Sequence, residues 1–234
     1  MDYHMTTEAP TLDGAEPIEQ RGRARPTPKS AETRTRIVSG ALQTLETHGL
    51  HETTTRRIAA AADVRLATLH YHFANKEAVL LAVLDMLVNE LKLTLKADLV
   101  PRESFDLHIA EVLRASWAYV ERTRAKQIVQ YELTLYALRT QGSEWLARRQ
   151  YEGYVDAYVA MLRDGARLDD TGLDDTQVRS LAHLMLAGID GLILQALAGA
   201  ADQHLRMSLK AVTAGAQAVA RTMAQQGRMA SRAD

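Results

Sequence analysis

The chain contains no cysteine, and this absence removes several kinds of chemistry. Disulfide bonds, thiolate catalysis and thiol redox sensing are excluded, and the composition is compatible with a reducing cytosol. The amino terminus also lacks a basic segment followed by an apolar stretch, so no secretory signal is visible. We therefore expect a cytoplasmic protein.

Proline is almost confined to the first 28 residues, which hold four of the five, and the fifth is Pro101. The same 28 residues show no apolar periodicity, so we expect a disordered tail there. Strand signals are absent from the rest of the chain, where apolar residues recur at helical spacing. The predicted fold class is all-α, and 234 residues with 47% hydrophobic content suffice for one or two domains with a sizeable core.

Signatures of catalysis and of metal binding are also missing. The sequence has no nucleophile elbow and no phosphate-binding glycine loop. His70 and His72 lie two residues apart, so on a helix they point in different directions and cannot chelate one metal. The acidic turn at residues 169–175 lacks the twelfth-position glutamate of a calcium loop, and a connector followed by a helix cap explains it. We expect no cofactor, no metal and no enzymatic activity.

Residues 53–77 have the pattern of two short helices joined by a tight turn. Thr54 can cap the first helix, and Asp63 stands at the turn, where aspartate tolerates a left-handed backbone. A second helix is predicted from Leu66 to Phe73, with Leu69 and Phe73 on its inner face. The side chains left facing outward or sideways are Arg65, Thr68, His70, Tyr71 and His72. Such a second helix could present these side chains to the edges of DNA bases.

The pattern over residues 33–84 resembles the DNA-binding motif of the tetracycline-repressor (TetR) family. The matching positions of the two short helices and their flanks are Ile58, Ala59, Ala62, Val64, Thr68, Leu69, His72, Phe73, Lys76 and Glu77. The matching positions of an earlier helix are Arg36, Ile37, Ala41, Leu42 and Leu45, followed by His48 and Gly49. The resemblance implies an N-terminal three-helix helix-turn-helix DNA-binding domain at residues 29–77. A helical effector-binding and dimerisation domain would follow at residues 78–234.

Three positions depart from the family pattern. Asp63 replaces a usual glycine, Arg65 replaces a capping serine or threonine, and His70 replaces a tyrosine that commonly reaches a phosphate. We expect the turn to survive, because aspartate adopts the required conformation at modest cost. Arg65 gains a phosphate contact in exchange for the lost cap, and Tyr71 is expected to share the phosphate role of position 70.

The resemblance and the side-chain chemistry together suggest DNA-binding roles. The side chains expected mainly to grip phosphates are Arg57, Arg65, Tyr71, His72 and Lys76. The side chains expected to meet base edges are Ala67, Thr68 and His70, and Thr54 completes the DNA-binding set. In a homodimer, two such heads are expected roughly 34 to 36 Å apart on a palindromic double-stranded DNA operator.

The net charge of −1 conceals an uneven distribution along the chain. Residues 1–20 hold five acidic and no basic side chains, whereas residues 21–77 hold ten basic and five acidic ones. The basic excess therefore lies where DNA contacts are predicted. Residues 21–30 form a basic arm, which either follows the DNA backbone or minor groove or is an ordinary solvated tail.

Beyond residue 77 the apolar pattern is helical throughout. A long helix capped by Asn75 should run from Lys76 to about Leu99. Further helices are predicted over residues 104–123, 125–140, 144–168, 175–198 and 202–226. Residues 181–201 are long enough for a membrane span, but a central Asp190 would cost roughly 2.5 to 3.5 kcal/mol there. A buried helix of a soluble protein explains the run better, so we expect no membrane partner.

The last two helices suggest how subunits pair, because both carry apolar residues at helical spacing. The resemblance implies a four-helix dimer interface built from them. The candidate interface residues are Leu181, Leu184, Met185, Gly188, Leu192, Leu205, Leu209, Val212 and Val219. Alternatively both helices simply close the core of one subunit, and the two interpretations can both hold for different faces.

An effector pocket is expected in the middle of the chain, where tyrosines recur on one helical face. The candidate pocket residues are Trp117, Tyr131, Glu132, Tyr136, Tyr151, Tyr154, Tyr158 and His183. This mixture could enclose a small, partly aromatic molecule with a few polar anchors. The alternative is that the aromatic residues are plain core.

These observations predict a transcriptional repressor that binds a palindromic operator as a dimer and is released by a small-molecule effector. Effector binding would change the spacing of the two heads through the helix that begins at Lys76. Two alternatives remain open: an activator or nonspecific architectural DNA binder, and a helical enzyme or carrier in which the motif is incidental packing. The clustering of basic residues around the motif argues against an enzyme.

Overall fold

The computed structural model describes residues 27–100, 102–164 and 171–230. These residues form helices and no strand, which confirms the all-α prediction. In chain order the helices are α1 (Pro28–Glu52), α2 (Thr55–Ala61), α3 (Leu66–His72), α4 (Lys76–Asp98), α5 (Phe105–Arg122), α6 (Arg124–Arg139), α7 (Glu144–Asp164), α8 (Asp175–Leu197) and α9 (Asp202–Ala230). The predicted tail, most of the basic arm and the start of the acidic turn lie outside the described residues.

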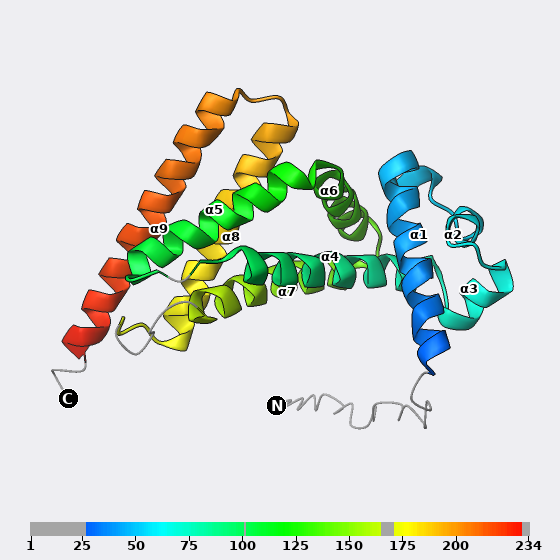
Figure 1. Ribbon diagram of the computed structural model, residues 1–234, viewed down its shortest axis with the longest axis horizontal. Coiled ribbons are helices and arrows are strands. Elements are labelled where there is room, and N and C mark those ends of the chain that lie inside the picture. The colour runs from blue at the N-terminus through cyan, green and yellow to red at the C-terminus, as the bar shows by residue number, and fades with distance from the viewer. Residues whose placement is uncertain (1–26, 101, 165–170, 231–234) are drawn as a thin grey trace, which may run out of the picture.

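The helices form an elongated molecule with two distinct ends (Figure 1). Helices α1, α2 and α3 make up one end, which we call the head. Helices α4 and α7 run side by side along the length of the molecule, and the antiparallel pair α8 and α9 lies at the other end with α5 against it. Helix α6 contacts α1 in the head as well as α7 and α8, so it spans the region between the two ends.

Helix starts follow the predicted capping residues. The Thr54 hydroxyl accepts a hydrogen bond from the Arg57 backbone N–H at 3.2 Å. Asn75 Oδ1 accepts one from the Ala78 N–H at 2.8 Å. These bonds satisfy backbone donors that the first helical turn leaves unpaired. Two of the predicted boundaries, at the starts of α2 and α4, are therefore confirmed together with their physical cause.

Buried side chains form two clusters. The first fills the head and contains Ile37, Ile58, Leu69 and Phe73, but it continues into α6 and α7 through residues such as Leu133. The second and larger cluster lies among α4, α5, α7, α8 and α9. Because the first cluster crosses residue 77, the head is packed onto the rest of the chain. The domain boundary at residue 77 remains a prediction.

Helix α8 is long and apolar enough to cross a membrane by length and composition alone. Its inner face, which includes Leu181, Met185 and Leu192, is buried in the larger cluster against other helices of the subunit. Packing inside the protein therefore accounts for the apolar residues of this inner face.

The predicted dimer stripe needs a correction. Leu181, Met185, Leu192 and Leu205 are buried within the subunit, and Leu209 and Val212 pack against the same cluster. Gly188 lets α9 approach closely, because a Cβ there would collide with Val212. Val219 is half-buried, and of the predicted set only Leu184 is an exposed large side chain, at 41%. The stripe mainly closes the core of one subunit, because α8 and α9 pack on each other and on α5.

Candidate DNA-binding interface and core cavity

The two short helices of the head meet at a tight turn that the sequence encodes locally. Asp63 has a φ of 50°, the left-handed conformation expected for it. Helix α1 supports the turn from behind, because a Cβ on Gly40 would lie only 2.7 Å from the Ala62 backbone nitrogen. A glycine is therefore needed at position 40 for α1 and α2 to pack this closely.

Two arginines of α1 hold this arrangement, and sequence reasoning did not assign them this role. Arg36 donates to the carbonyl oxygens of Ala62 and Asp63 at 2.9 and 2.6 Å, which satisfies acceptors at the end of α2. Arg34 lies over the Phe73 ring, 4.1 Å from its centroid, and donates to the His72 carbonyl at 3.2 Å. The orientation of α3 is thus fixed by contacts at both of its ends.

Most of the predicted DNA-binding side chains are accessible. The exposed ones are Thr54, Arg57, Arg65, Ala67, His70 and Tyr71, whereas Thr68, His72 and Lys76 are half-buried. The Tyr71 side chain is 78% exposed, and its ring packs edge to face against the His72 ring. A large aromatic side chain this exposed on a short helix is available for an external partner. The roles assigned to these residues remain predictions.

Some of these side chains already have partners within the subunit. Arg57 forms an ion pair with Glu52 at 2.5 Å, and Lys76 donates to the Leu50 carbonyl at 3.3 Å. Burial lowers the pKa of Lys76, and burial together with the nearby Arg34 charge lowers the pKa of His72. Arg65, which has no internal ion pair within the described residues, is the clearest cation for DNA.

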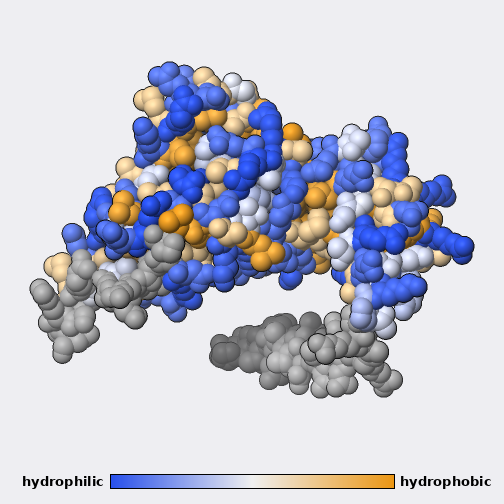
Figure 2. Space-filling model, viewed as in Figure 1, coloured by the Kyte–Doolittle hydropathy of each residue, from blue (hydrophilic) through white to orange (hydrophobic). Residues whose placement is uncertain are grey.

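The surface differs between the two ends of the molecule. In Figure 2 hydrophilic side chains predominate around the head, and apolar patches interrupt the surface of the remaining helices. A hydrophilic head suits contact with a charged, hydrated polymer, whereas apolar patches suit contact with protein.

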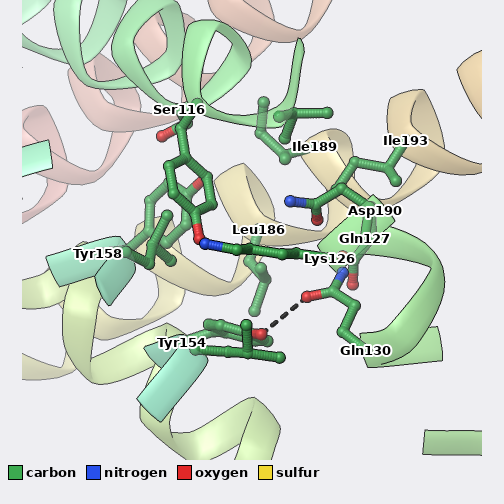
Figure 3. A pocket seen from close by; sticks show the side chains of 14 residues that line it. Ser116, Lys126, Gln127, Gln130, Tyr154, Tyr158, Leu186, Ile189, Asp190 and Ile193 are labelled. Atoms are coloured by element: carbon green, nitrogen blue, oxygen red, sulfur yellow. Dashed lines mark hydrogen bonds between the residues drawn. The ribbon is translucent and has the colours of Figure 1, made fainter. Parts of the chain in front are cut away.

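A cavity lies in the larger part of the molecule, between α4, α5, α6, α7 and α8. Its walls are mainly apolar, with polar groups from α6 and α8 facing tyrosines from α5 and α7. The lining residues are Leu87, Leu91, Ser116, Tyr119, Val120, Lys126, Gln127, Gln130, Tyr154, Tyr158, Leu186, Ile189, Asp190 and Ile193. Figure 3 shows Tyr154 and Tyr158 on one side and Gln127, Gln130 and Asp190 on the other. Its open space is about 30 Å³, so a ligand larger than one or two water molecules must push its walls apart.

Hydrogen bonds orient the polar groups of this cavity. The Tyr154 hydroxyl donates to Gln130 Oε1 at 2.7 Å (Figure 3). Beside the cavity, the Tyr131 hydroxyl donates to the Asp190 backbone carbonyl at 3.2 Å and to its carboxylate at 3.3 Å. The Lys126 ammonium is paired with Glu90 at 2.5 Å. The cavity can therefore offer preoriented donors and acceptors to a ligand.

Several predicted pocket residues are found at or near this cavity. Tyr154 and Tyr158 line it, and Tyr131 and Tyr151 hydrogen-bond to Asp190 on its wall. Trp117 instead lines a second cavity of about 200 Å³, which shares wall residues such as Gln127 with the first. Tyrosines spaced three and four apart on α7 therefore do face the interior together.

Three predicted pocket residues lie away from this cavity. Glu132 faces the head, where its carboxylate accepts a hydrogen bond from the Leu50 N–H at 3.0 Å. Tyr136 donates to Glu77 at 2.9 Å near the start of α4. His183 is exposed on α8. A helix turns about 100° per residue, so Glu132 and Tyr136 face away from the wall that Gln127 and Gln130 form.

Sequence reasoning missed the polar groups that α6 and α8 bring to the cavity. Asp190 stood out only as a charge inside an apolar run. Burial raises the pKa of its carboxyl group, against the lowering effect of the Tyr151 and Tyr131 hydrogen bonds. The available signal was an acidic residue within an otherwise apolar helix. Burying an unpaired charge costs free energy, so such residues are found mostly where the charge has a function.

Comparison with known proteins identifies related sequences and structures. Residues 37–83 match the family model described as "Bacterial regulatory proteins, tetR family". A nicotine-responsive transcriptional repressor of Paenarthrobacter nicotinovorans, HdnoR, is 22% identical over 173 residues, which cover 74% of this chain and 88% of the relative.

Among solved structures, the multidrug binding protein EbrR complexed with imidazole is 26% identical, with a TM-score of 0.54 over 76% of this chain and 93% of that one. A TetR-family regulator from Mesorhizobium loti, 15% identical, has a TM-score of 0.65 over 82% of this chain and 98% of its own. The head, the helical body and their order along the chain are therefore shared with these proteins.

Proposed function

Because the chain belongs to the TetR family of DNA-binding transcriptional regulators, we propose that it is a repressor that binds a palindromic operator as a homodimer. We further propose that a small organic molecule, bound in the cavity between α4 and α8, releases it from DNA. The family is non-enzymatic and its members are soluble cytoplasmic proteins, so this chain is expected to act on transcription in the cytoplasm.

The observation that carries this proposal is the position of α6. One side of α6 supplies Gln127 and Gln130 to the cavity. The same helix contacts the head through Glu132 and the start of α4 through Tyr136. A ligand that displaces α6 must therefore also change the contacts that orient α1 and the start of α4. This arrangement supports a coupling route through α6 in addition to α4.

Contacts to DNA are expected from α3 and its flanks. The exposed Arg65 and Tyr71 suit phosphates, whereas Ala67, Thr68 and His70 suit base edges in the major groove. The packing of Arg34 and Arg36 against the turn supports a recognition helix that is held rigidly before DNA arrives.

A dimer interface is proposed on the outer face of α8 and α9, opposite the stripe that closes the core. Gly191 and Gly215 lie within these helices, and a Cβ at either position would meet nothing within 4 Å. Glycine inside a helix costs about 1 kcal/mol relative to alanine, so packing against a second copy would explain both. The exposed apolar residues beside them are Leu184, Ala187, Leu194, Met207, Ala211 and Ala218.

Relatives support a small organic effector. HdnoR is described as nicotine-responsive, and EbrR has been solved with imidazole, ethidium and malachite green. The cavity of this chain is mainly apolar with a few polar groups, which suits a small organic molecule.

The proposal can be tested by footprinting the purified protein on the DNA upstream of its own gene, at physiological salt, with and without a metabolite library. We expect a protected palindrome, a dimeric complex in sedimentation, and loss of protection with at least one compound. A monomer that prefers no genomic fragment over random DNA would reject the repressor function.

A further inference from the structure

Asp190 is the acidic side chain that α8 brings to the cavity wall. It lies among apolar neighbours of the same helix, including Leu186, Ile189 and Ile193, all of which also line the cavity. Within the described part of the chain, no Lys, Arg or His nitrogen lies within 4 Å of its carboxylate. Asp190 is half-buried, and a partly desolvated carboxylate without a cationic partner is costly, so its position calls for an explanation.

The other charges at the cavity do not neutralise Asp190. Lys126 is the basic residue on the wall, and its ammonium is already paired with the Glu90 carboxylate at 2.5 Å. That pair is neutral as a unit. The cavity with an ionised Asp190 therefore keeps one net negative charge.

Hydrogen bonds orient the Asp190 carboxylate without neutralising it. Tyr131 donates to it at 3.3 Å, and Tyr151 donates to the same group. Burial raises the pKa of Tyr151 to about 12, so this side chain remains a neutral phenol that supplies a dipole but no charge. Burial likewise raises the pKa values of Tyr119, Tyr154 and Tyr158.

These three tyrosines give the cavity aromatic walls. Tyr119, Tyr154 and Tyr158 line it, and the rings of Tyr151 and Tyr154 lie edge to face with centroids 6.5 Å apart. The faces of phenol rings attract cations and also pack against apolar or aromatic groups. A carboxylate surrounded by tyrosine rings is the chemical complement of a positively charged nitrogen attached to an apolar group.

We propose that the cavity binds an organic cation, with its charged nitrogen beside Asp190 and its aromatic or apolar part among the tyrosines. This inference rests on the proposed function in taking the cavity as the effector site, and it adds the chemical class of the effector. Ligand binding would then neutralise the carboxylate that connects α8 to Tyr131 of α6, which is the helix that contacts the head.

A matched pair of probes tests the proposal by calorimetry on the full-length protein without DNA. Benzyltrimethylammonium and neopentylbenzene have the same shape and differ in charge, because a quaternary carbon replaces the nitrogen. We expect the cation to bind at least about tenfold more tightly than the neutral molecule. Asp190→Asn should abolish this preference, whereas Asp156→Asn, at an exposed acid paired with Arg179, should preserve it.

Loss of folding in the Asp190→Asn variant should not account for a loss of the preference for the cation. Asparagine removes the buried charge and keeps an acceptor for Tyr131, so the melting temperature of the Asp190→Asn variant should equal or exceed that of the parent. Equal affinity for the two probes, a preference that survives Asp190→Asn, or no measurable binding of the cation would overturn the proposal. Tighter binding of phenylacetate than of the cation would also overturn it and would assign the site to Lys126.

A separate measurement on a labelled operator fragment distinguishes failure of this inference from failure of the proposed function. If the protein shows no operator preference at all, the repressor function fails, whatever the calorimetry shows. If the operator is bound and released by a neutral or anionic compound that competes for the cavity, the repressor function stands and the cation inference fails.

Discussion

The carboxylate of Glu132 on α6 accepts a hydrogen bond from the backbone N–H of Leu50 at 3.0 Å. The contact follows Gly49, whose φ of 70° breaks α1 near its end. It joins the helix that lines the cavity to the head, across 82 positions in sequence. Movement of α6 must therefore either carry the end of α1 with it or break this bond.

Replacing Glu132 with alanine tests this connection. The Leu50 N–H would lose its partner, so we expect a loss of about 1 to 3 kcal/mol in unfolding free energy and a weaker effect of effector on operator affinity. Chemical denaturation and operator titrations with and without effector measure the two effects. Glu152→Ala, at an exposed site on α7, is the control. Unchanged coupling in Glu132→Ala would exclude α6 as the route.

Arg65 and Thr68 should behave differently on DNA. Arg65→Ala should weaken binding to all sequences and reduce the slope of log affinity against log salt by about 0.9 for the lost phosphate contact. Thr68→Ala should instead change the preference between operator variants by roughly 1 to 3 kcal/mol per misread base pair. Fluorescence anisotropy over a salt series measures both. An unaltered slope for Arg65→Ala would remove it from the phosphate contacts.

Gly215 offers a test of the proposed dimer face. A leucine there has open space within the subunit, so the folded monomer should tolerate it, but it would hold a second copy away from α9. We expect the sedimentation coefficient to fall to the monomer value with little change in helical circular dichroism. Arg206→Leu adds the same side chain on another face of α9 and should leave the dimer intact. A dimeric Gly215→Leu variant would refute the interface.

Glu111 makes stability depend on pH in the acid range. Hydrogen bonding from Arg114 and then from Arg102 lowers the pKa of this buried carboxyl to about 2, against the raising effect of burial. Because the folded-state pKa lies below the ordinary glutamate value of 4.5, the stabilisation is present above pH 4.5 and is lost as pH falls toward 2. Glu111→Gln should cost on the order of 1 to 3 kcal/mol at pH 7.

Thermal melts of the parent and the Glu111→Gln variant between pH 7 and pH 2 check this. The gap between their melting temperatures should narrow as the carboxyl group of the parent becomes protonated. A gap that stays constant across this range would show that the Arg114 and Arg102 contacts do not stabilise the ionised form.

The helix-turn-helix could be read from the sequence because its signals are local. Thr54 caps a helix that starts one residue later, Asp63 occupies the left-handed position beside it, and Leu69 and Phe73 face inward four residues apart. Each feature depends on residues within one or two helical turns. The same reasoning found the start of α4 at Asn75.

The cavity could only partly be predicted. The tyrosine repeat of α7 correctly indicated that Tyr154 and Tyr158 share an interior face. It could not show that Gln130 and Asp190 lie opposite them. Nor could it show that Glu132 points to the head and Tyr136 to the start of α4, because this depends on how α6 is rotated between its neighbours. Similarly, the stripe containing Leu181 and Leu205 had an apolar pattern that suits either a core or a partner subunit.

The sequence by itself determined the helices, their order and the DNA-binding motif, because capping, periodicity and turn conformation act between residues close together in the chain. Only the tertiary structure decided which faces of α6, α8 and α9 are turned inward. Those orientations arise from the simultaneous packing of several helices against one another. Asp190 and Glu132 therefore acquire their roles from neighbours far away in the sequence, through contacts that no local pattern records.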